Sequence, residues 1–137
     1  MSNTVFDRND FGHLAGRILM AVIFVAAGIG KLTAFQGTVG YIASQGVPLP
    51  SLAAVATICL EIGGGMMLIL GFKARWAAAA LGLFTIVAGL IFHNFWAASP
   101  DQFQNQLIHF QKNLAMAGGL LYLVLHGSGR YSLGKRG

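Results

Sequence analysis

The segment Ser51–Phe72, which reads SLAAVATICLEIGGGMMLILGF, decides the fold class. Its only charged residue is Glu61, and a helix needs about 20 apolar residues to cross the hydrocarbon core of a bilayer. We therefore predict a membrane-spanning helix here. A helix rises about 1.5 Å per residue, so Glu61 is expected about 15 Å from Ser51, close to the middle of the membrane. An ionisable residue at that depth is costly, so we expect it to have a partner and a role.

The composition of the whole chain is that of a membrane protein. Hydrophobic residues make up 55% of its 137 residues and charged residues only 9%, whereas soluble domains have about 25% charged residues. The mean hydropathy is +0.67. These charges are too few to cover a water-exposed surface, so the surface is expected to face lipid. The net charge of +5 is attributed to membrane topology, because the basic residues are not interleaved with aromatic residues as nucleic-acid binding would require.

Hydropathy predicts an all-α membrane protein, a four-helix bundle forming a single domain over residues 1–137. Arg17 lies near the start of the first span, and its long side chain is expected to reach back to the membrane interface. The fourth span is short, which tilt or local thinning can accommodate. Short, poorly ordered polar tails are expected before and after the bundle. The expected spans cover residues 14–32, 51–72, 76–98 and 113–128, and the expected tails cover residues 1–12 and 130–137.

Two connections between these spans are longer than turns. Residues 33–50 contain Gly46–Pro50, which reads GVPLP and cannot continue a helix. Residues 99–111 are polar, with Phe103, Leu107 and Phe110 at helical spacing. We expect this second connection to lie as a short helix at the membrane interface.

The distribution of basic residues predicts the orientation. Seven of the nine Lys and Arg residues fall on the side that holds both termini, and only Lys31 and Lys112 fall on the other. Cytoplasmic segments of membrane proteins carry the excess of basic residues, so both termini are expected in the cytoplasm. The seven are Arg8, Arg17, Lys73, Arg75, Arg130, Lys135 and Arg136.

Polar residues from different spans are expected to gather in the non-cytoplasmic half of the bundle. Lys31 ends the first span, His93 lies near the end of the third, and Lys112 and Asn113 open the fourth. We predict a bundle interior that holds Glu61, His93 and Lys112 and opens outward. Whether Glu61 pairs with Lys31, with Lys112 or with neither stays open. Both lysines can also be plain interfacial anchors, and His93 can belong to an aromatic belt.

Several chemistries are not indicated. A single cysteine, Cys59, excludes an internal CxxC pair and an intrachain disulfide. The four histidines show no HxxxH or HxxE spacing, so no metal site is predicted. The glycines Gly63–Gly65 lie within a span, where they serve helix packing rather than phosphate binding.

The order and spacing of several short motifs resemble the DoxX family over nearly the whole chain. One departure is Gly134, where the family often has Asp after Ser-Leu, so a role for that acid does not carry over. The matching residues are Gly28, Lys31 and Leu32; Gly46–Pro50; Glu61–Gly64 with Leu68, Gly71 and Arg75; His93; Lys112–Leu114; Gly118–Leu121; and Gly127–Leu133.

This resemblance implies a small, four-helix protein of the bacterial inner membrane. Some members are similar to the membrane subunit of a thiosulfate:quinone oxidoreductase, and others resemble partners in membrane redox and oxidative-stress complexes. A quinone-linked role suits the residues, because quinone carbonyls need hydrogen-bond donors and a proton source. The candidate quinone-binding residues are Lys31, Glu61, His93, Lys112 and Asn113, with Glu61 and His93 as the catalytic candidates.

Two other functions stay open at this point. The protein can be a non-catalytic membrane scaffold that docks a redox or stress enzyme, or a small transporter that works as a homo-oligomer. Gly12, Gly16, Gly82 and Gly89 offer surfaces for helix packing. No intrinsic cofactor is expected. A redox role would therefore need a bound quinone or a partner subunit to supply electrons, and whether the chain is an enzyme is left undecided.

Overall fold

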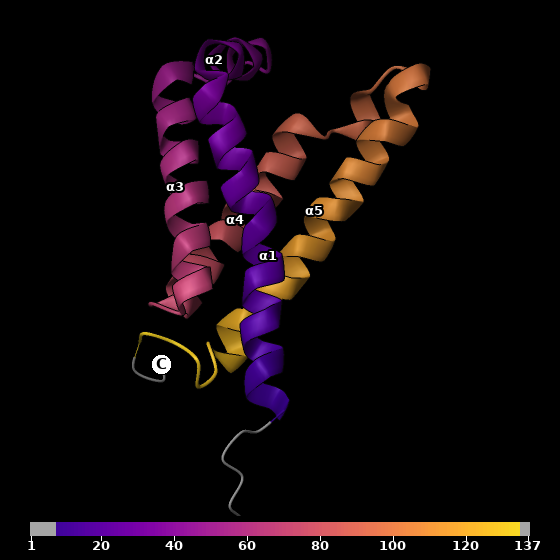
Figure 1. Ribbon diagram of the computed structural model, residues 1–137. Coiled ribbons are helices and arrows are strands. Elements are labelled where there is room, and N and C mark those ends of the chain that lie inside the picture. The colour runs from indigo at the N-terminus through magenta and orange to yellow at the C-terminus, as the bar shows by residue number, and fades with distance from the viewer. Residues whose placement is uncertain (1–7, 135–137) are drawn as a thin grey trace, which may run out of the picture.

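The computed structural model describes residues 8–134, and its regular secondary structure there is entirely helical (Figure 1). The all-α class is therefore confirmed. The described part has five α-helices and one short 3₁₀ helix, rather than the expected four helices. The helices are α1 (Arg8–Thr33), α2 (Phe35–Ser44), α3 (Pro50–Leu70), α4 (Ala74–Phe92), the 3₁₀ helix η1 (Phe95–Ala97) and α5 (Pro100–His126).

Three segments of the described chain are long and apolar enough to cross a membrane. They are Asn9–Thr33, Pro50–Leu70 and Ala74–Ala97. The first three expected spans overlap these segments. Residues 113–126 of the fourth expected span lie in α5, which has 27 residues and is long enough but is not apolar enough to be counted among these segments.

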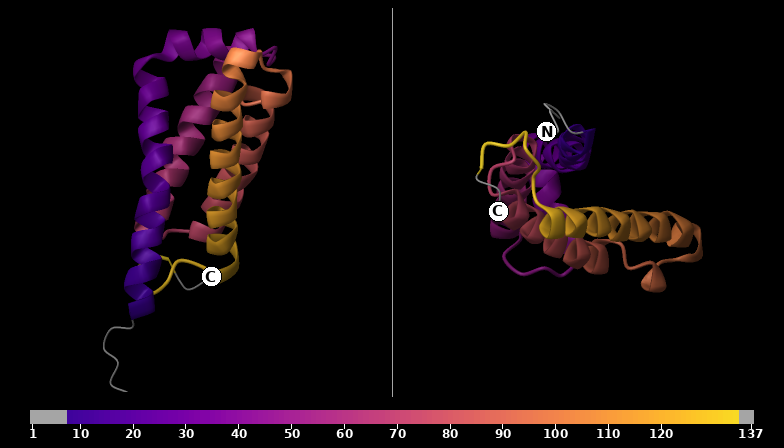
Figure 2. Two further views of the ribbon diagram at one scale, coloured as in Figure 1. Left: turned by 90° about the vertical axis from the view of Figure 1, so that its right-hand side faces the viewer. Right: turned by 90° about the horizontal axis from the view of Figure 1, so that it is seen from below.

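Both long connections contain more helix than expected. Residues 35–44 form α2, because Phe35, Val39 and Ile42 give this run the apolar stripe of a helix. This helix lies across the end of the bundle (Figure 2). The helix ends before Gly46, whose φ of 75° is left-handed. Residues 100–111 are not a separate helix but the first half of α5. Neither Pro nor Gly interrupts the chain between Asp101 and Ala117, so the helix continues.

The bundle is built from two helix pairs joined through α3 and α4. Helix α1 packs along α3, and α4 packs along α5 (Figure 1). The apolar core between them includes Phe24, Leu68, Leu81 and Leu120. Helices α1 and α3 approach closely where Gly65 faces Val25; a Cβ atom on Gly65 would lie only 2.6 Å from Val25 Cγ2. Small residues at helix contacts are the usual means of close packing in membranes.

Both ends of the described chain lie at the same end of the bundle (Figures 1 and 2). The backbone N–H of Arg130 donates a hydrogen bond of 3.2 Å to Asp10 Oδ1. The expected polar tails are therefore partly wrong: residues 8–12 belong to α1, and the backbone N–H of Leu133 donates to the Leu70 carbonyl at 2.9 Å. The other tail residues, 1–7 and 135–137, lie outside the described residues.

The side chain of Arg17 is buried inside the protein and does not extend to the surface, as a side chain that reaches back to the interface was expected to do. Its side chain is 0% exposed, and its guanidinium donates to the carbonyls of Leu68 at 3.0 Å and Ile69 at 3.2 Å. A third bond reaches the Tyr131 carbonyl. The last carbonyls of a helix lack intrahelical partners and carry partial negative charge, so a buried cation satisfies them. Arg17 thus caps α3 and fastens the C-terminal segment to it.

Candidate functional site

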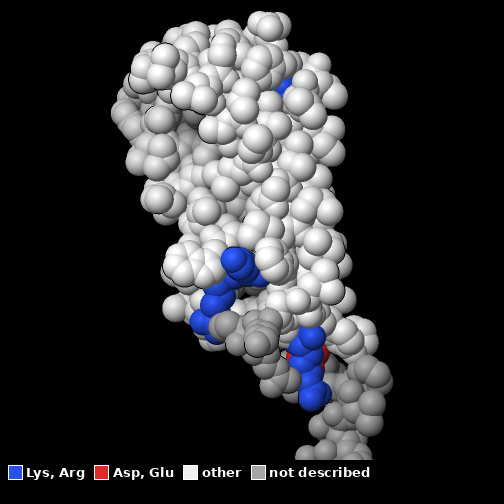
Figure 3. Space-filling view, turned by 90° about the vertical axis from the view of Figure 1, so that its left-hand side faces the viewer, with Lys and Arg blue, Asp and Glu red and all other residues white. Residues whose placement is uncertain are grey.

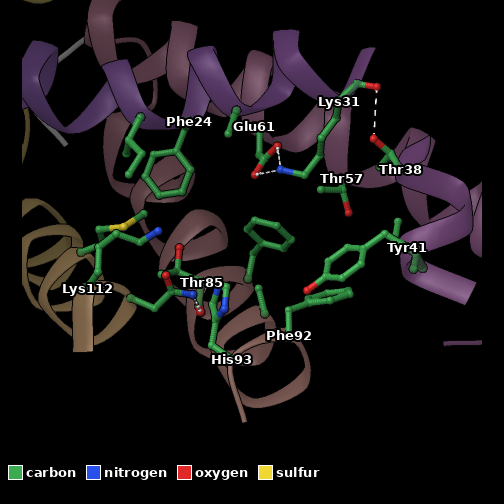
Figure 4. A pocket seen from close by; sticks show the side chains of 17 residues that line it. Phe24, Lys31, Thr38, Tyr41, Thr57, Glu61, Thr85, Phe92, His93 and Lys112 are labelled. Atoms are coloured by element: carbon green, nitrogen blue, oxygen red, sulfur yellow. Dashed lines mark hydrogen bonds and ion pairs between the residues drawn. The ribbon is translucent and has the colours of Figure 1, made fainter. Parts of the chain in front are cut away.

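A cavity of about 240 Å³ lies between the helices (Figure 4). Residues of α2 line it, which places it toward the end of the bundle opposite the ends of the described chain (Figure 1). All five α-helices contribute to its wall, which is largely apolar and aromatic. The five candidate site residues from different parts of the sequence all line this one cavity. They are Lys31 on α1, Glu61 on α3, His93 after α4, and Lys112 and Asn113 on α5.

One wall of the cavity carries an ion pair. The Lys31 ammonium lies 2.9 Å from Glu61 Oε1 and 2.8 Å from Oε2, and the Glu61 side chain is only 5% exposed. Close contact between α1 and α3 makes this reach possible, since a Cβ on Gly28 would lie 3.2 Å from Glu61 Cβ. The question that the sequence left open is thereby answered, because Glu61 pairs with Lys31 and not with Lys112.

The opposite wall is held by hydrogen bonds between α4 and α5. Asn113 is buried, and its Nδ2 donates to the Thr85 carbonyl at 3.0 Å. That carbonyl uses one of the two amide hydrogens of Asn113, so one remains for another acceptor. Gly89 leaves room for this contact, since a Cβ there would lie 3.4 Å from Asn113 Cβ. Asn113 therefore fixes the position of α5 as well as lining the cavity.

A row of polar side chains lies at the edge of the same wall. Nδ1 of His93 is 3.0 Å from Gln106 Oε1, which leaves Nε2 as the acceptor of the neutral ring. The rings of His93 and His109 stack with centroids 5.0 Å apart. Lys112 Nζ in turn lies 3.4 Å from His109 Nδ1. Figure 4 shows His93 and Lys112 across the cavity from the Lys31–Glu61 pair.

Sequence reasoning missed the contribution of α2. Thr38, Tyr41 and Ile42 line the cavity, and the Tyr41 ring lies 5.5 Å from that of Phe92 at the end of α4. These residues were missed because residues 33–50 were interpreted as a connection between spans. The spacing of Phe35, Val39 and Ile42 is nevertheless that of a helix. Arg17 was also misjudged, but it belongs to the opposite end of the bundle.

The wall offers hydrogen-bond donors and one ion pair in apolar surroundings. Within residues 8–134, no group of three or more His, Cys, Asp or Glu residues is arranged to hold a metal ion. The three phenylalanines Phe24, Phe84 and Phe92 line the same space. Such a site suits a flat apolar molecule that carries a few hydrogen-bonding oxygens.

Comparisons with known proteins agree with this membrane architecture. A model of the DoxX family matches residues 12–94. Inner membrane protein YphA of Escherichia coli is 36% identical over 123 residues, which cover 90% of this chain and 88% of that protein. Inner membrane protein YqjF of Escherichia coli is 39% identical over 124 residues, 90% of each chain.

A more distant relative carries a redox name. The putative oxidoreductase CatD of Bacillus subtilis is 28% identical over 82 residues, covering 60% of this chain and 59% of that protein. No solved structure matches. With the family match over residues 12–94 and the two inner membrane relatives, the chain belongs to the DoxX family and is an integral protein of the bacterial inner membrane.

Proposed function

We propose that this protein binds the head group of a membrane quinone in its cavity, as a subunit or accessory of a membrane redox complex. One observation carries the proposal. Polar residues that are far apart in the sequence line a single aromatic-walled cavity within the apolar part of the bundle. An intramembrane ionisable residue is by default a sign of a functional site, and here two of them, Lys31 and Glu61, face that cavity.

The size and lining of the cavity suit a single ring. Pockets for drug-sized ligands have volumes of about 300–1,000 Å³, and a cavity of about 240 Å³ is smaller than these, of a size for one ring. A quinone ring would fit there while its isoprenoid tail extends into lipid. The rings of Phe84 and Phe92 would cover its faces, and Lys112 and the remaining amide hydrogen of Asn113 would donate to its carbonyls.

The residues of this chain would bind the ring and handle protons. A bound quinone would supply the redox chemistry, taking up electrons together with protons. Glu61, held by Lys31 at 2.8 Å, is positioned to accept or give a proton inside the cavity. His93 lies on the opposite wall, where its Nε2 is available as a second proton acceptor. The word oxidoreductase in the name of the CatD relative supports a redox role.

The proposal includes four membrane crossings, with both termini in the cytoplasm. The bond between Arg130 and Asp10 supports an even number of crossings, because three would separate these residues across the membrane. The fourth crossing would use residues 113–126 of α5. Basic side chains gather at the end of the bundle that carries the chain ends (Figure 3), as the positive-inside rule requires of a cytoplasmic end.

Quinone binding to the purified protein in lipid nanodiscs tests this function. Lys112→Ala should weaken the binding of a short-chain quinone by about tenfold, since it removes a charged donor to a quinone carbonyl. Glu61→Gln should also weaken binding, because it removes the carboxylate that holds the Lys31 ammonium in the cavity wall. Arg75→Ala is the matched control, because Arg75 is exposed at the opposite end of the bundle and does not line the cavity. Equal binding by the wild type and both cavity variants would refute the proposal.

A further inference from the structure

The two walls of the cavity differ in charge. On the α1 and α3 side, the Lys31 ammonium is neutralised by the Glu61 carboxylate at 2.8 Å. On the α5 side, Lys112 has no carboxylate partner among residues 8–134. Its hydrogen-bond partner is His109, a residue without negative charge. The cavity therefore has one compensated cation and one uncompensated cation.

The other acidic side chains of the described chain are too far away to compensate Lys112. Asp10 lies with Arg130, at the end of the bundle opposite the cavity. Asp101 is on the same helix as Lys112, but at about 1.5 Å per residue it lies roughly 16 Å away along the axis. The neighbours of Lys112 in the wall, His93 and Asn113, are neutral or cationic. A ligand in the cavity thus meets a net positive charge.

This charge matters because the rest of the wall is apolar. An electrostatic attraction is stronger beside Phe84, Phe92 and Met116 than in water, where the solvent screens it. Lys112 is exposed at the edge of the cavity, so its long side chain can carry the ammonium toward the membrane interface when no ligand is bound. An anionic oxygen brought in by a ligand would form a charge-assisted hydrogen bond with it, about twice as strong as a neutral one.

We propose that the cavity prefers an acidic ring compound, a hydroxyquinone-like molecule with an oxygen ionised at neutral pH, and that this oxygen lies at Lys112. The proposal rests on the proposed function for the ring itself and adds the charge of the ligand. The apolar body of the ligand would lie between Phe84 and Phe92. The compensated pair of Lys31 and Glu61 would face its neutral edge.

The test compares two probes that differ by one hydroxyl group. The full-length protein in nanodiscs of zwitterionic lipid is titrated at pH 7 with 1,4-naphthoquinone, which is neutral, and with 2-hydroxy-1,4-naphthoquinone, which is anionic. Because the two partition differently into lipid, the quantity compared is the ratio of their affinities in each variant. Lys112→Met should lower the affinity for the neutral probe by about tenfold and that for the acidic probe by about a hundredfold, so that the ratio changes about tenfold.

Two further variants keep the result interpretable. Lys112→Arg retains the charge and should retain the preference for the acidic probe, which also checks that position 112 tolerates substitution. Lys73→Met removes a cation that lies outside the cavity and should change neither affinity.

Each outcome distinguishes this inference from the proposed function. A neutral probe that binds while the acidic probe does not, or equal loss of both in Lys112→Met, would overturn the inference and leave quinone binding standing. If neither probe binds to the wild type, both are overturned.

Discussion

The ammonium of Lys31 lies between the two carboxylate oxygens of Glu61, at 2.9 and 2.8 Å, and joins α1 to α3 inside the cavity. Taking both groups out of water is costly, and their mutual attraction offsets that cost only while both are present. This pair therefore links the stability of the bundle to the site.

Removing Lys31 alone should be more harmful than removing both charges. Lys31→Met leaves the buried Glu61 without its partner and should destabilise the protein by about 1–3 kcal/mol, below the usual range for buried pairs because Lys31 is 31% exposed. The double variant Lys31→Met/Glu61→Gln should recover part of this loss. Thermal unfolding in detergent measures both. Additive losses in the double variant would contradict the pairing, since coupled residues are non-additive.

Arg17 should be essential for the packing of the C-terminal segment against the end of α3. Arg17→Met removes the bonds that the guanidinium donates to the carbonyls of Leu68, Ile69 and Tyr131 and should cost about 2–4 kcal/mol. It should also release the C-terminal segment, so that trypsin cleaves after Arg130 faster than in the wild type. Arg75→Met, at an exposed position of the same end, is the control and should change neither property. Unchanged cleavage in Arg17→Met would argue against this role.

Gly28 should be required for the close contact between α1 and α3. A Cβ there would lie 2.6 Å from Ile62 Cγ1 and 3.3 Å from the Ile62 backbone nitrogen. Gly28→Ala should therefore force the helices apart and cost about 1–3 kcal/mol, as overpacked cores do. A Cβ on Gly30 of the same helix would meet no side chain and no neighbouring helix within 4 Å. Gly30→Ala should be neutral or slightly stabilising, and an equal loss in both variants would contradict the packing argument.

The proposed orientation predicts which positions are accessible from outside the cell. In a Cys59→Ser background, a cysteine at Gln104 should react with a membrane-impermeant maleimide in intact cells. A cysteine at Arg75 should react only after the inner membrane is permeabilised. Both positions are exposed, so reactivity reports the side of the membrane rather than burial. Labelling of position 75 in intact cells would invert the proposed topology.

The sequence predicted the gathering of polar residues better than it predicted the individual partners. Glu61, His93 and Lys112 could be assigned to one half of the bundle because hydropathy gives depth within each span. Depth alone could not choose between Lys31 and Lys112 as the partner of Glu61, because that choice depends on how closely α1 and α3 pack at Gly28.

Other features depend on contacts between distant parts of the chain. Arg17 looked like an interfacial residue because its partners, the last carbonyls of α3 and the Tyr131 carbonyl, are backbone groups that carry no sequence signal. Helix α2 was missed because Gly46–Pro50 suggested a loop, although those residues only end the helix. The continuity of α5 was missed because its first half is polar and its second half is apolar. Hydropathy therefore divided one uninterrupted helix into a connection and a span.

The central claim, that a quinone ring binds in the cavity, is tested most directly by photoaffinity labelling. The protein in nanodiscs would be irradiated with an azido-quinone, and the modified residues located by mass spectrometry with and without an excess of unmodified quinone. We predict that labelling is competed and falls on cavity residues such as Tyr41, Phe84 and Phe92. Labelling confined to exposed positions outside the cavity such as Leu19 and Trp76, or unaffected by competitor, would contradict the account.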